Sequence, residues 1–391
     1  RPEQGWAISA EGMQALFALT NGTDPVFRGN DGATCDHGTN LSTVAGRRQA
    51  FSLLTSRGLI RVEMPVPAGA EFQVTGVTNQ YGCVSLTALS TYRRPLPSTN
   101  LKFLSAVMWD GRESTAPSTV KVTNDASLIL DLEHQSADAV AGHAQGTTPL
   151  SPALQQQIVD FETHLFTAQA YDYAAGHLNA NGATGGPEAI ATQQFFIGIN
   201  DPLGGNPFGT PFTPVIFTLF KSWTNSQGFG GQAREAIARG EALFNSRNIN
   251  ITGVAGVNDA LGTAVIPGTC GTCHSSPNGG NHSVSLPINI GVADLNNSLG
   301  VGYLPVITLR NSSTGATVQT TDPGRALVTG KWSDIGKFKG PVLRGLASRA
   351  PYFHNGSAQK LSDVINFYNH RFAMGLTQQE KSDLALFLAA L

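Results

Sequence analysis

The pattern Cys-Gly-Thr-Cys-His at residues 270–274 constrains this chain more than any other feature. In C-x-x-C-H, each thiol can form a thioether with a vinyl group of a porphyrin, and the imidazole that follows ligates the iron. A zinc site needs four ligands, and no second C-x-x-C or H-x-x-x-H completes one. The pattern therefore predicts one covalent haem c, attached at Cys270 and Cys273 with His274 as the iron ligand.

The two remaining cysteines, Cys35 and Cys83, are predicted to form a disulfide that closes a loop of about 48 residues. A single-thioether haem at Cys35 is the alternative, but Asp36 stands where an attachment histidine would follow, and His37 comes one residue later. A disulfide and a haem c both indicate a periplasmic or secreted bacterial protein. The chain begins at Arg1 without a signal-type apolar stretch, so we expect that a signal peptide has been removed.

Composition excludes several classes of protein. Charged residues make up 13% of the chain and its formal net charge is −2, without a basic run, which predicts no nucleic-acid surface. No apolar run reaches the length of about 18 residues that spans a membrane, so no membrane span is predicted. The 44 glycines and 21 prolines indicate long loops.

Apolar periodicity predicts a helix over 150–165, and the capping box at Thr377-Gln-Gln-Glu380 opens a final helix. Two short runs over 59–77 predict a β hairpin. The stretches 175–215 and 245–335 are rich in Gly, Asn and Pro and are predicted to be long loops that wrap a cofactor.

The chain contains an internal repeat. Met13-Gln-Ala-Leu-Phe17 matches Gly240-Glu-Ala-Leu-Phe244, and Met108-Trp-Asp-Gly111 matches Phe353-His-Asn-Gly356. The haem attachment pattern lies between the two motifs in the second copy and is missing from the first. The order of these motifs predicts two related halves.

The C-terminal motifs resemble the bacterial di-haem cytochrome c peroxidase superfamily, including its MauG-like branch. The residues that carry this resemblance are Lys339-Gly-Pro-Val-Leu-Arg344, Arg349-Ala-Pro-Tyr-Phe-His-Asn-Gly-Ser357, Leu361-Ser-Asp-Val-Ile-Asn-Phe-Tyr368 and, in the first half, Met108-Trp-Asp-Gly-Arg112. The resemblance covers nearly the whole chain. It implies a mono-haem member whose first haem site is degenerate.

The expected fold is mostly α, with two cytochrome-c-like helical domains, long loops and minor β hairpins. Residues 1–228 are expected to form an N-terminal domain without haem attachment, with an insertion over about 170–228. Residues 229–391 are expected to form the haem-binding domain.

In the family, an acidic residue in a Leu-Glu-x-Gln stretch acts on peroxide, and the matching position here is Gln145. An amide cannot shuttle a proton, so two-haem peroxidase chemistry is not expected. Trp109 resembles the tryptophan that relays electrons between the family's haems; the alternative is a packing role. Trp109 and Gln145 are the candidate catalytic residues, whereas His134 and His143 are predicted to have ordinary polar roles.

The sixth iron ligand decides how the haem reacts. Methionine raises the reduction potential and closes the iron to substrates, whereas tyrosine or an open site does the reverse. The resemblance implies Tyr368 as the first candidate, and Met374 is the second. His354, His282 and His370 are further candidates, and a core role for Tyr368 stays open.

Two further ligand sets are expected. Arg325, Trp332 and Lys339 are predicted to bind the haem propionates, the alternative being a solvated basic loop. The resemblance also implies a calcium ion near the carbonyls of residues 349–351.

Three functions follow from these residues. The first is an exported electron-transfer cytochrome. The second is a haem-dependent peroxidase or oxygenase that acts on an organic substrate, and the third is a structural or cell-surface haem protein. The expected partners are a redox partner protein or a small-molecule oxidant or substrate, and the sequence does not decide whether the chain is an enzyme.

Overall fold

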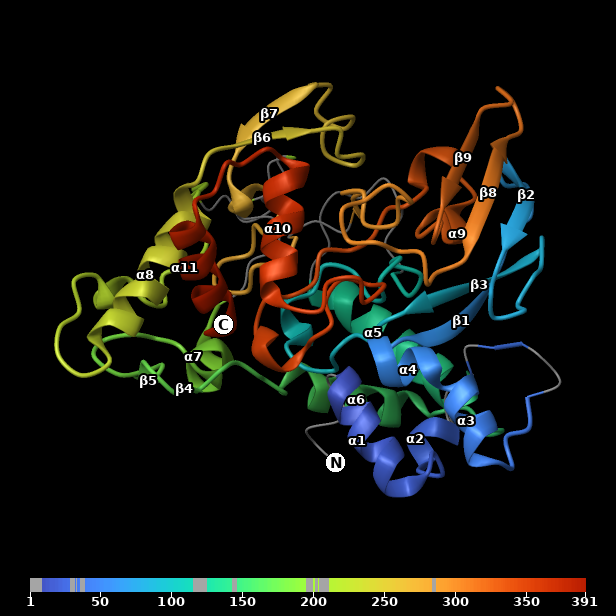
Figure 1. Cartoon of the computed structure of the whole chain (residues 1–391), viewed down its shortest axis with the longest axis horizontal. Coiled ribbons are helices and arrows are strands. Elements are labelled where there is room, and N and C mark those ends of the chain that lie inside the picture. Colours follow the sequence, from blue (N-terminus) through green and yellow to red (C-terminus); the bar gives the residue numbers. More distant parts are fainter. Residues whose placement is uncertain are drawn as a thin grey trace.

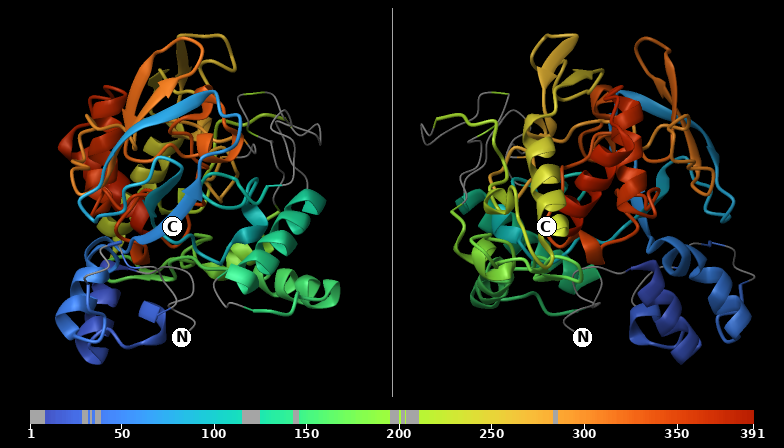
Figure 2. Two further views of the ribbon diagram at one scale, coloured as in Figure 1. Left: turned by 90° about the vertical axis from the view of Figure 1, so that its right-hand side faces the viewer. Right: turned by 60° about the vertical axis from the view of Figure 1, so that its left-hand side comes forward.

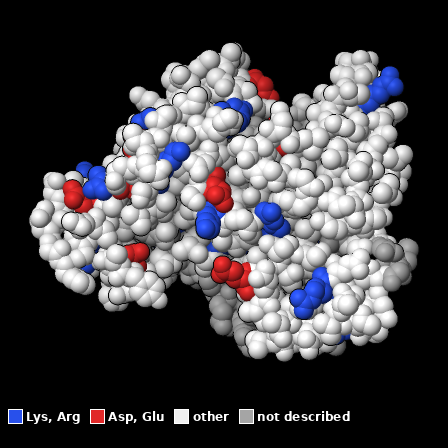
Figure 3. All heavy atoms as spheres, viewed as in Figure 1, with Lys and Arg blue, Asp and Glu red and all other residues white. Residues whose placement is uncertain are grey.

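A computed structural model of the chain describes residues 9–28, 32, 34, 35, 39–114, 125–142, 146–194, 200, 203, 211–282 and 286–391. His143 and Gln145, which the sequence singled out, lie outside these residues. None of the helices in the described ranges has the length and apolar character needed to cross a membrane. Charged side chains are sparse on the face shown in Figure 3, in keeping with the composition.

Helices form most of the regular structure, as expected. They are α1 (Ala10–Thr20), α2 (Pro25–Arg28), α3 (Val44–Ala50), α4 (Ser52–Arg57), α5 (Asp125–Gly142), α6 (Pro152–Thr163), α7 (Pro187–Thr192), α8 (Gly231–Ser246), α9 (Ala326–Thr329), α10 (Leu361–Arg371) and α11 (Gln378–Ala389). The predicted helix over 150–165 is confirmed as α6, and the predicted final helix is α11. The capping box of α11 is complete, because Thr377 and Glu380 each accept a hydrogen bond from the other's backbone N–H.

The strands are short and pair in four small antiparallel sheets. They are β1 (Ile60–Pro65), β2 (Phe72–Thr78), β3 (Ala88–Arg93), β4 (Tyr171–Asp172), β5 (Gly176–His177), β6 (Ile249–Thr252), β7 (Val265–Gly268), β8 (Val306–Asn311) and β9 (Thr317–Thr320). Strands β6 to β9 show that the predicted loop over 245–335 holds more regular structure than its composition indicated. Its Gly and Asn residues lie mainly in the turns between these strands.

The hairpin predicted over 59–77 is wrong, although both of its strands exist. β1 pairs with β3, and β2 pairs with β8. Pro65 and Pro67 flank the start of the connection, and proline cannot donate to a ladder, so β1 and β2 do not fold back on each other. As a result β2 joins a three-stranded sheet in which β8 lies between β2 and β9 (Figure 1). This sheet joins residues from both sides of the predicted boundary at 228/229.

The core of the second half forms where α8 packs against α11 (Figure 1). A Cβ atom at Gly240 would lie 2.1 Å from the carbonyl oxygen of Asp383, so glycine permits this close approach. Phe244 and Phe387 meet there with ring centroids 5.7 Å apart. α10 packs against α11, and together these helices form one wall of a cavity.

In the first half, α1 to α4 form a small cluster, and α5 and α6 pack together as a separate pair (Figure 2). The predicted disulfide is present: the Cys35 and Cys83 sulfurs lie 2.04 Å apart. The thiols of this half are therefore bonded to each other.

The repeated loops 108–111 and 353–356 have the same backbone shape. Met108 and Phe353 both have positive φ, at 66° and 65°, and each is followed three residues later by a glycine with positive φ. In both loops the N–H of that glycine bonds back to the first carbonyl. Each loop also accepts a hydrogen bond from the other half. The backbone N–H of Arg94 donates to the carbonyl oxygen of His354, and the backbone N–H of Lys339 donates to the carbonyl oxygen of Trp109.

Candidate cofactor site

An apolar cavity lies between α8, α10, α11 and the segment that holds the C-x-x-C-H pattern. It encloses about 1480 Å³ free of protein atoms, part of it open to solvent. Most of its lining is aliphatic or aromatic, and Cys270, Cys273 and His274 contribute to the same wall. Such a cavity suits a large, flat, mainly apolar ligand.

The C-x-x-C-H segment is shaped by its own side chains. A short 3-10 helix covers residues 270–272. Thr269 caps it by accepting from the N–H of Gly271, and Thr272 Oγ1 accepts from the N–H of Thr269 at 3.0 Å. This turn places both thiols on the cavity wall. The thiols are not bonded to each other, and burial raises the pKa of both to about 12.

His274 is held in one orientation. Its Nδ1 lies 2.6 Å from the carbonyl oxygen of Gly280. Burial lowers the pKa of the ring, so a neutral imidazole is favoured. A neutral ring donates from Nδ1 to this carbonyl and leaves the Nε2 lone pair for a metal. Two unpaired thiols, an oriented imidazole and an apolar cavity together fit a haem c.

Tyr368 and Met374 both line the cavity, as expected of sixth-ligand candidates. The ring centroids of Tyr368 and His274 lie 6.5 Å apart. The pKa of Tyr368 is raised by burial first and by the two cysteines second, so its hydroxyl is neutral without a cation nearby. Met374 is buried just after α10.

Among the three histidine candidates, only His354 contributes to the cavity wall. Its ring stacks on Phe338 at 3.7 Å, and burial lowers its pKa to about 4. His282 is buried but does not line the cavity, and burial lowers its pKa to about 4 as well. His370 is exposed on α10.

Trp109 and Lys339 also line the cavity. The indole N–H of Trp109 donates to the Arg94 carbonyl at 2.7 Å, so this ring has a fixed position. Lys339 is buried, and its pKa is lowered to about 7 by burial first and by Arg349 second. Nε and Nη2 of Arg349 find no partner among the described residues. Two buried basic side chains therefore lie together, and the described part of the chain places no carboxylate in a salt bridge with either.

The other two predicted propionate ligands lie elsewhere. Arg325 donates from Nη1 to the carbonyl of Asp110 at 2.9 Å, and Trp332 packs with the cluster around β2 and β8. Neither lines the cavity. Sequence proximity to Lys339 brought them into one prediction, but β-strand pairing carries that segment away from the cavity wall. Gln145, the other candidate catalytic residue, lies outside the described residues.

One of the carbonyls expected near a calcium ion, that of Arg349, accepts a hydrogen bond from an arginine side chain. Arg94 donates from Nη2 to the Arg349 carbonyl oxygen at 3.0 Å and from Nη1 to the Gly58 carbonyl. The calcium ion at residues 349–351 stays a prediction.

Asp110 and Arg112 form an ion pair at 3.1 Å, within a larger network that the sequence did not reveal. Arg93 bonds to Asp110 at 2.5 Å and, from the other half of the chain, to Asp322 at 2.7 Å. All three side chains are almost completely buried. The network fixes the loop that holds Trp109.

The residues of the cavity fit a c-type cytochrome site, and the similar proteins are named cytochrome-c peroxidases. No family model matches the chain. It is 33% identical to the cytochrome-c peroxidase IdrP2 of Denitromonas iodatirespirans over 32% of this chain and 36% of that protein. It is 28% identical to IdrP2 of Pseudomonas sp. (strain SCT) over 46% of this chain and 53% of that protein. The chain is therefore similar to cytochrome-c peroxidases of the superfamily that its motifs resemble, and each of these two matches spans only about a third to a half of the relative's length.

Two solved structures are weakly similar. A MauG-like protein associated with microbial copper homeostasis is 19% identical, with a TM-score of 0.40 over 81% of this chain and 76% of that one. Hydrazine synthase of Kuenenia stuttgartiensis is 16% identical, with a TM-score of 0.38 over 95% of this chain and 87% of that one. Both likenesses are too low to indicate a function.

Proposed function

We propose that this chain is an exported c-type cytochrome with one covalent haem and a redox role, foremost in electron transfer. The observation that carries this proposal is the different state of the two cysteine pairs. Cys270 and Cys273 are unpaired on the wall of an apolar cavity, whereas Cys35 and Cys83 are bonded to each other. One attachment site is therefore available, and the disulfide supports a periplasmic or secreted location.

The protein's own residues would hold the haem as follows. Cys270 and Cys273 supply the two thioethers, and His274 supplies Nε2 while Gly280 orients its ring. Lys339 lines the cavity and would offer its ammonium group to a propionate, whereas Arg349 lies near Lys339 but not on the cavity wall. The aliphatic and aromatic lining excludes water. When bound, the haem supplies a reversible one-electron couple at iron.

Tyr368 is proposed as the sixth ligand and Met374 as the alternative. Tyr368 is supported by its ring, 6.5 Å from that of His274, and by its position on α10. Tyrosine ligation would also favour the second candidate function, a haem-dependent peroxidase or oxygenase. In either function, Trp109 is proposed to pass charge between the cavity and the protein surface.

Counting and spectroscopy of the haem test this proposal. A pyridine haemochrome assay is expected to give one haem per chain; two haems would contradict the proposal. In the ferric spectrum, Tyr368→Phe is expected to remove tyrosinate charge-transfer absorption, while Met374→Leu leaves it unchanged. A sulfur-to-iron band that disappears in Met374→Leu would instead identify methionine. Reaction of the ferrous protein with peroxide or oxygen would favour the enzyme over the electron carrier.

A further inference from the structure

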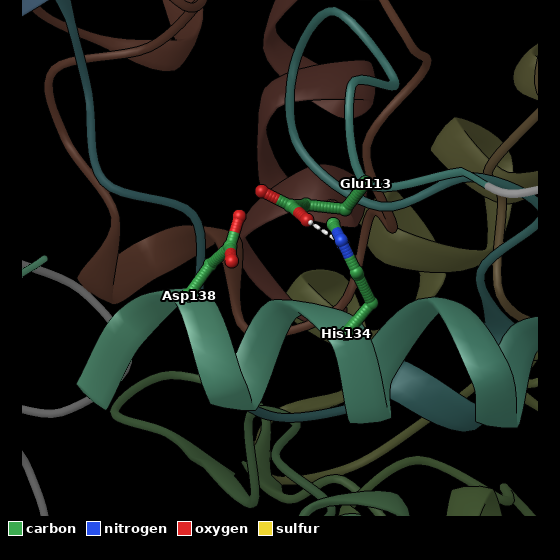
Figure 4. Close-up of side chains that lie close together, drawn as sticks. All are labelled: Glu113, His134 and Asp138. Carbon is green, nitrogen blue, oxygen red and sulfur yellow. Dashed lines mark hydrogen bonds and ion pairs between the residues drawn. The ribbon is translucent and has the colours of Figure 1, made fainter. Parts of the chain in front are cut away.

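A second group of metal-ligating side chains lies in the first half, away from the cysteine cavity. Glu113 follows the loop that holds Trp109, and His134 and Asp138 are on α5. Figure 4 shows the three side chains converging from these two elements. One ligand atom from each lies within 4.8 Å of the others, and Glu113 Oε2 is 2.7 Å from His134 Nδ1.

The local structure explains why these side chains meet. His134 and Asp138 are four residues apart, so they project from the same face of α5. The Glu113 side chain is only 7% exposed, and Arg112 holds it by contacts to Glu113 at 3.9 Å and to Asp110 at 3.1 Å. The buried ion network of Asp110 therefore extends to Glu113 and fixes its carboxylate opposite α5.

Asp138 distinguishes this group from an ordinary ion pair. Its carboxylate points toward the Glu113–His134 pair, yet it makes no hydrogen bond or salt bridge within the described ranges. Glu113 and Asp138 together have a charge of −2, and a neutral imidazole adds none. A divalent cation would balance this charge, and the exposure of His134 and Asp138 leaves room for water ligands.

We propose that Glu113, His134 and Asp138 bind a divalent transition-metal ion of the Zn²⁺ class. One imidazole nitrogen and two carboxylates match the ligands that Zn²⁺ takes, with water in the open position. Ca²⁺ and Mg²⁺ prefer shells made of oxygen, so the imidazole selects against them. The ion replaces the proton shared by His134 and Glu113 and ties α5 to the Trp109 loop. This site is independent of the haem.

The test is calorimetric titration of Zn²⁺ into the haem-loaded protein after treatment with a chelator. The intact chain is expected to bind Zn²⁺ at this site, and Asp138→Asn is expected to weaken the binding at least about tenfold. Asp138 is exposed and forms no bond among the described residues, so its substitution leaves the fold intact. His134→Gln tests the imidazole, with circular dichroism as the check on folding.

α6 offers a matched control. Asp160 on α6 and His164 at its C-cap are an exposed pair with the same four-residue spacing, and the described residues offer them no third ligand. Asp160→Asn and His164→Gln are expected to leave Zn²⁺ binding unchanged. Equal Zn²⁺ affinity in Asp138→Asn and the unchanged chain would overturn the proposal, as would the absence of Zn²⁺ binding. Equal affinity for Mg²⁺ would overturn the assigned class of ion.

Discussion

The two cysteine pairs of this chain are in different chemical states. In the second half, two free thiols and an oriented histidine face an apolar cavity. In the first half, the thiols close a covalent bridge. The comparison teaches that a cysteine pair outside an attachment pattern can still stabilise its region, because a disulfide restricts the unfolded chain.

The repeated loops differ in the same way. Trp109 and His354 occupy equivalent positions, and both side chains line the cavity. The indole N–H of Trp109 is bonded to the Arg94 carbonyl, whereas Nε2 of His354 has no partner among the described residues. One loop therefore has a fixed packing side chain, and the other keeps a polar atom available to a ligand.

The largest effect is expected from removing the two attachment cysteines. Replacement of both Cys270 and Cys273 by serine is expected to abolish covalent haem, because no thiol then remains on the cavity wall. The matched double variant, Cys35→Ser with Cys83→Ser, is expected to keep one haem per chain. A haem-stained denaturing gel measures both. Retention of covalent haem by the first variant would contradict the assignment.

The second largest effect is expected from breaking the buried ion pair between Arg93 and Asp322, which joins the two halves. Asp322→Asn leaves Arg93 buried with one fewer carboxylate and is expected to lower the free energy of unfolding by up to about 5 kcal/mol. The control is Glu63→Gln, which removes the pair between the exposed Glu63 and the partly buried Arg61 and is expected to have a smaller effect, about 1 kcal/mol. Urea denaturation compares the two, and equal effects would argue against a buried network.

The disulfide should stabilise the first half without affecting the cofactor. Loss of a bridge between residues 48 apart is expected to cost about 4 kcal/mol of unfolding free energy. The measurement is denaturation of the Cys35→Ser, Cys83→Ser variant in its haem-loaded state. A shift in the haem absorption spectrum would show that the bridge acts on the cavity after all.

The smallest effect compares helix starts in the two halves. Thr377→Ala at α11 and Ser151→Ala at α6 each remove a cap and are expected to cost about 1 kcal/mol. Only α11 has an acidic partner: hydrogen bonds from Thr377 lower the pKa of Glu380. The stability that ionised Glu380 contributes is therefore fully present above the ordinary glutamate pKa. It is lost as the pH falls through the lowered pKa of Glu380. Thermal melts of both variants at several pH values give the loss of stability that each substitution causes. This loss is expected to become smaller at low pH for Thr377→Ala and to stay constant for Ser151→Ala.

Much of the cofactor site could be predicted from sequence because its information is local. The residues at 270–274 supply thiols and imidazole within one turn, and the capping box at Thr377 marks a helix start by itself. The partners of β1 and β2 were missed because strand pairing depends on distant residues. Asp322 was missed for the same reason, since it meets Arg93 only after the two halves pack.

The candidate metal ligands were only half visible in the sequence. The spacing of His134 and Asp138 places them on one helical face, but Glu113 comes from a loop whose course depends on the buried Asp110. Arg325 and Trp332 show the converse error, because they are close to Lys339 in sequence and yet do not line the cavity.

The sheet that joins β2 to β8 and β9 limits how this chain can be divided. Residues 229–391 expressed alone would lack β2 and leave the edge of β8 open to another strand, which favours aggregation. The same fragment would lose Arg94, whose N–H binds the loop of His354. A stable haem-binding fragment must therefore include a strand that pairs with the β8 edge. A fragment that simply starts at residue 229 lacks that strand.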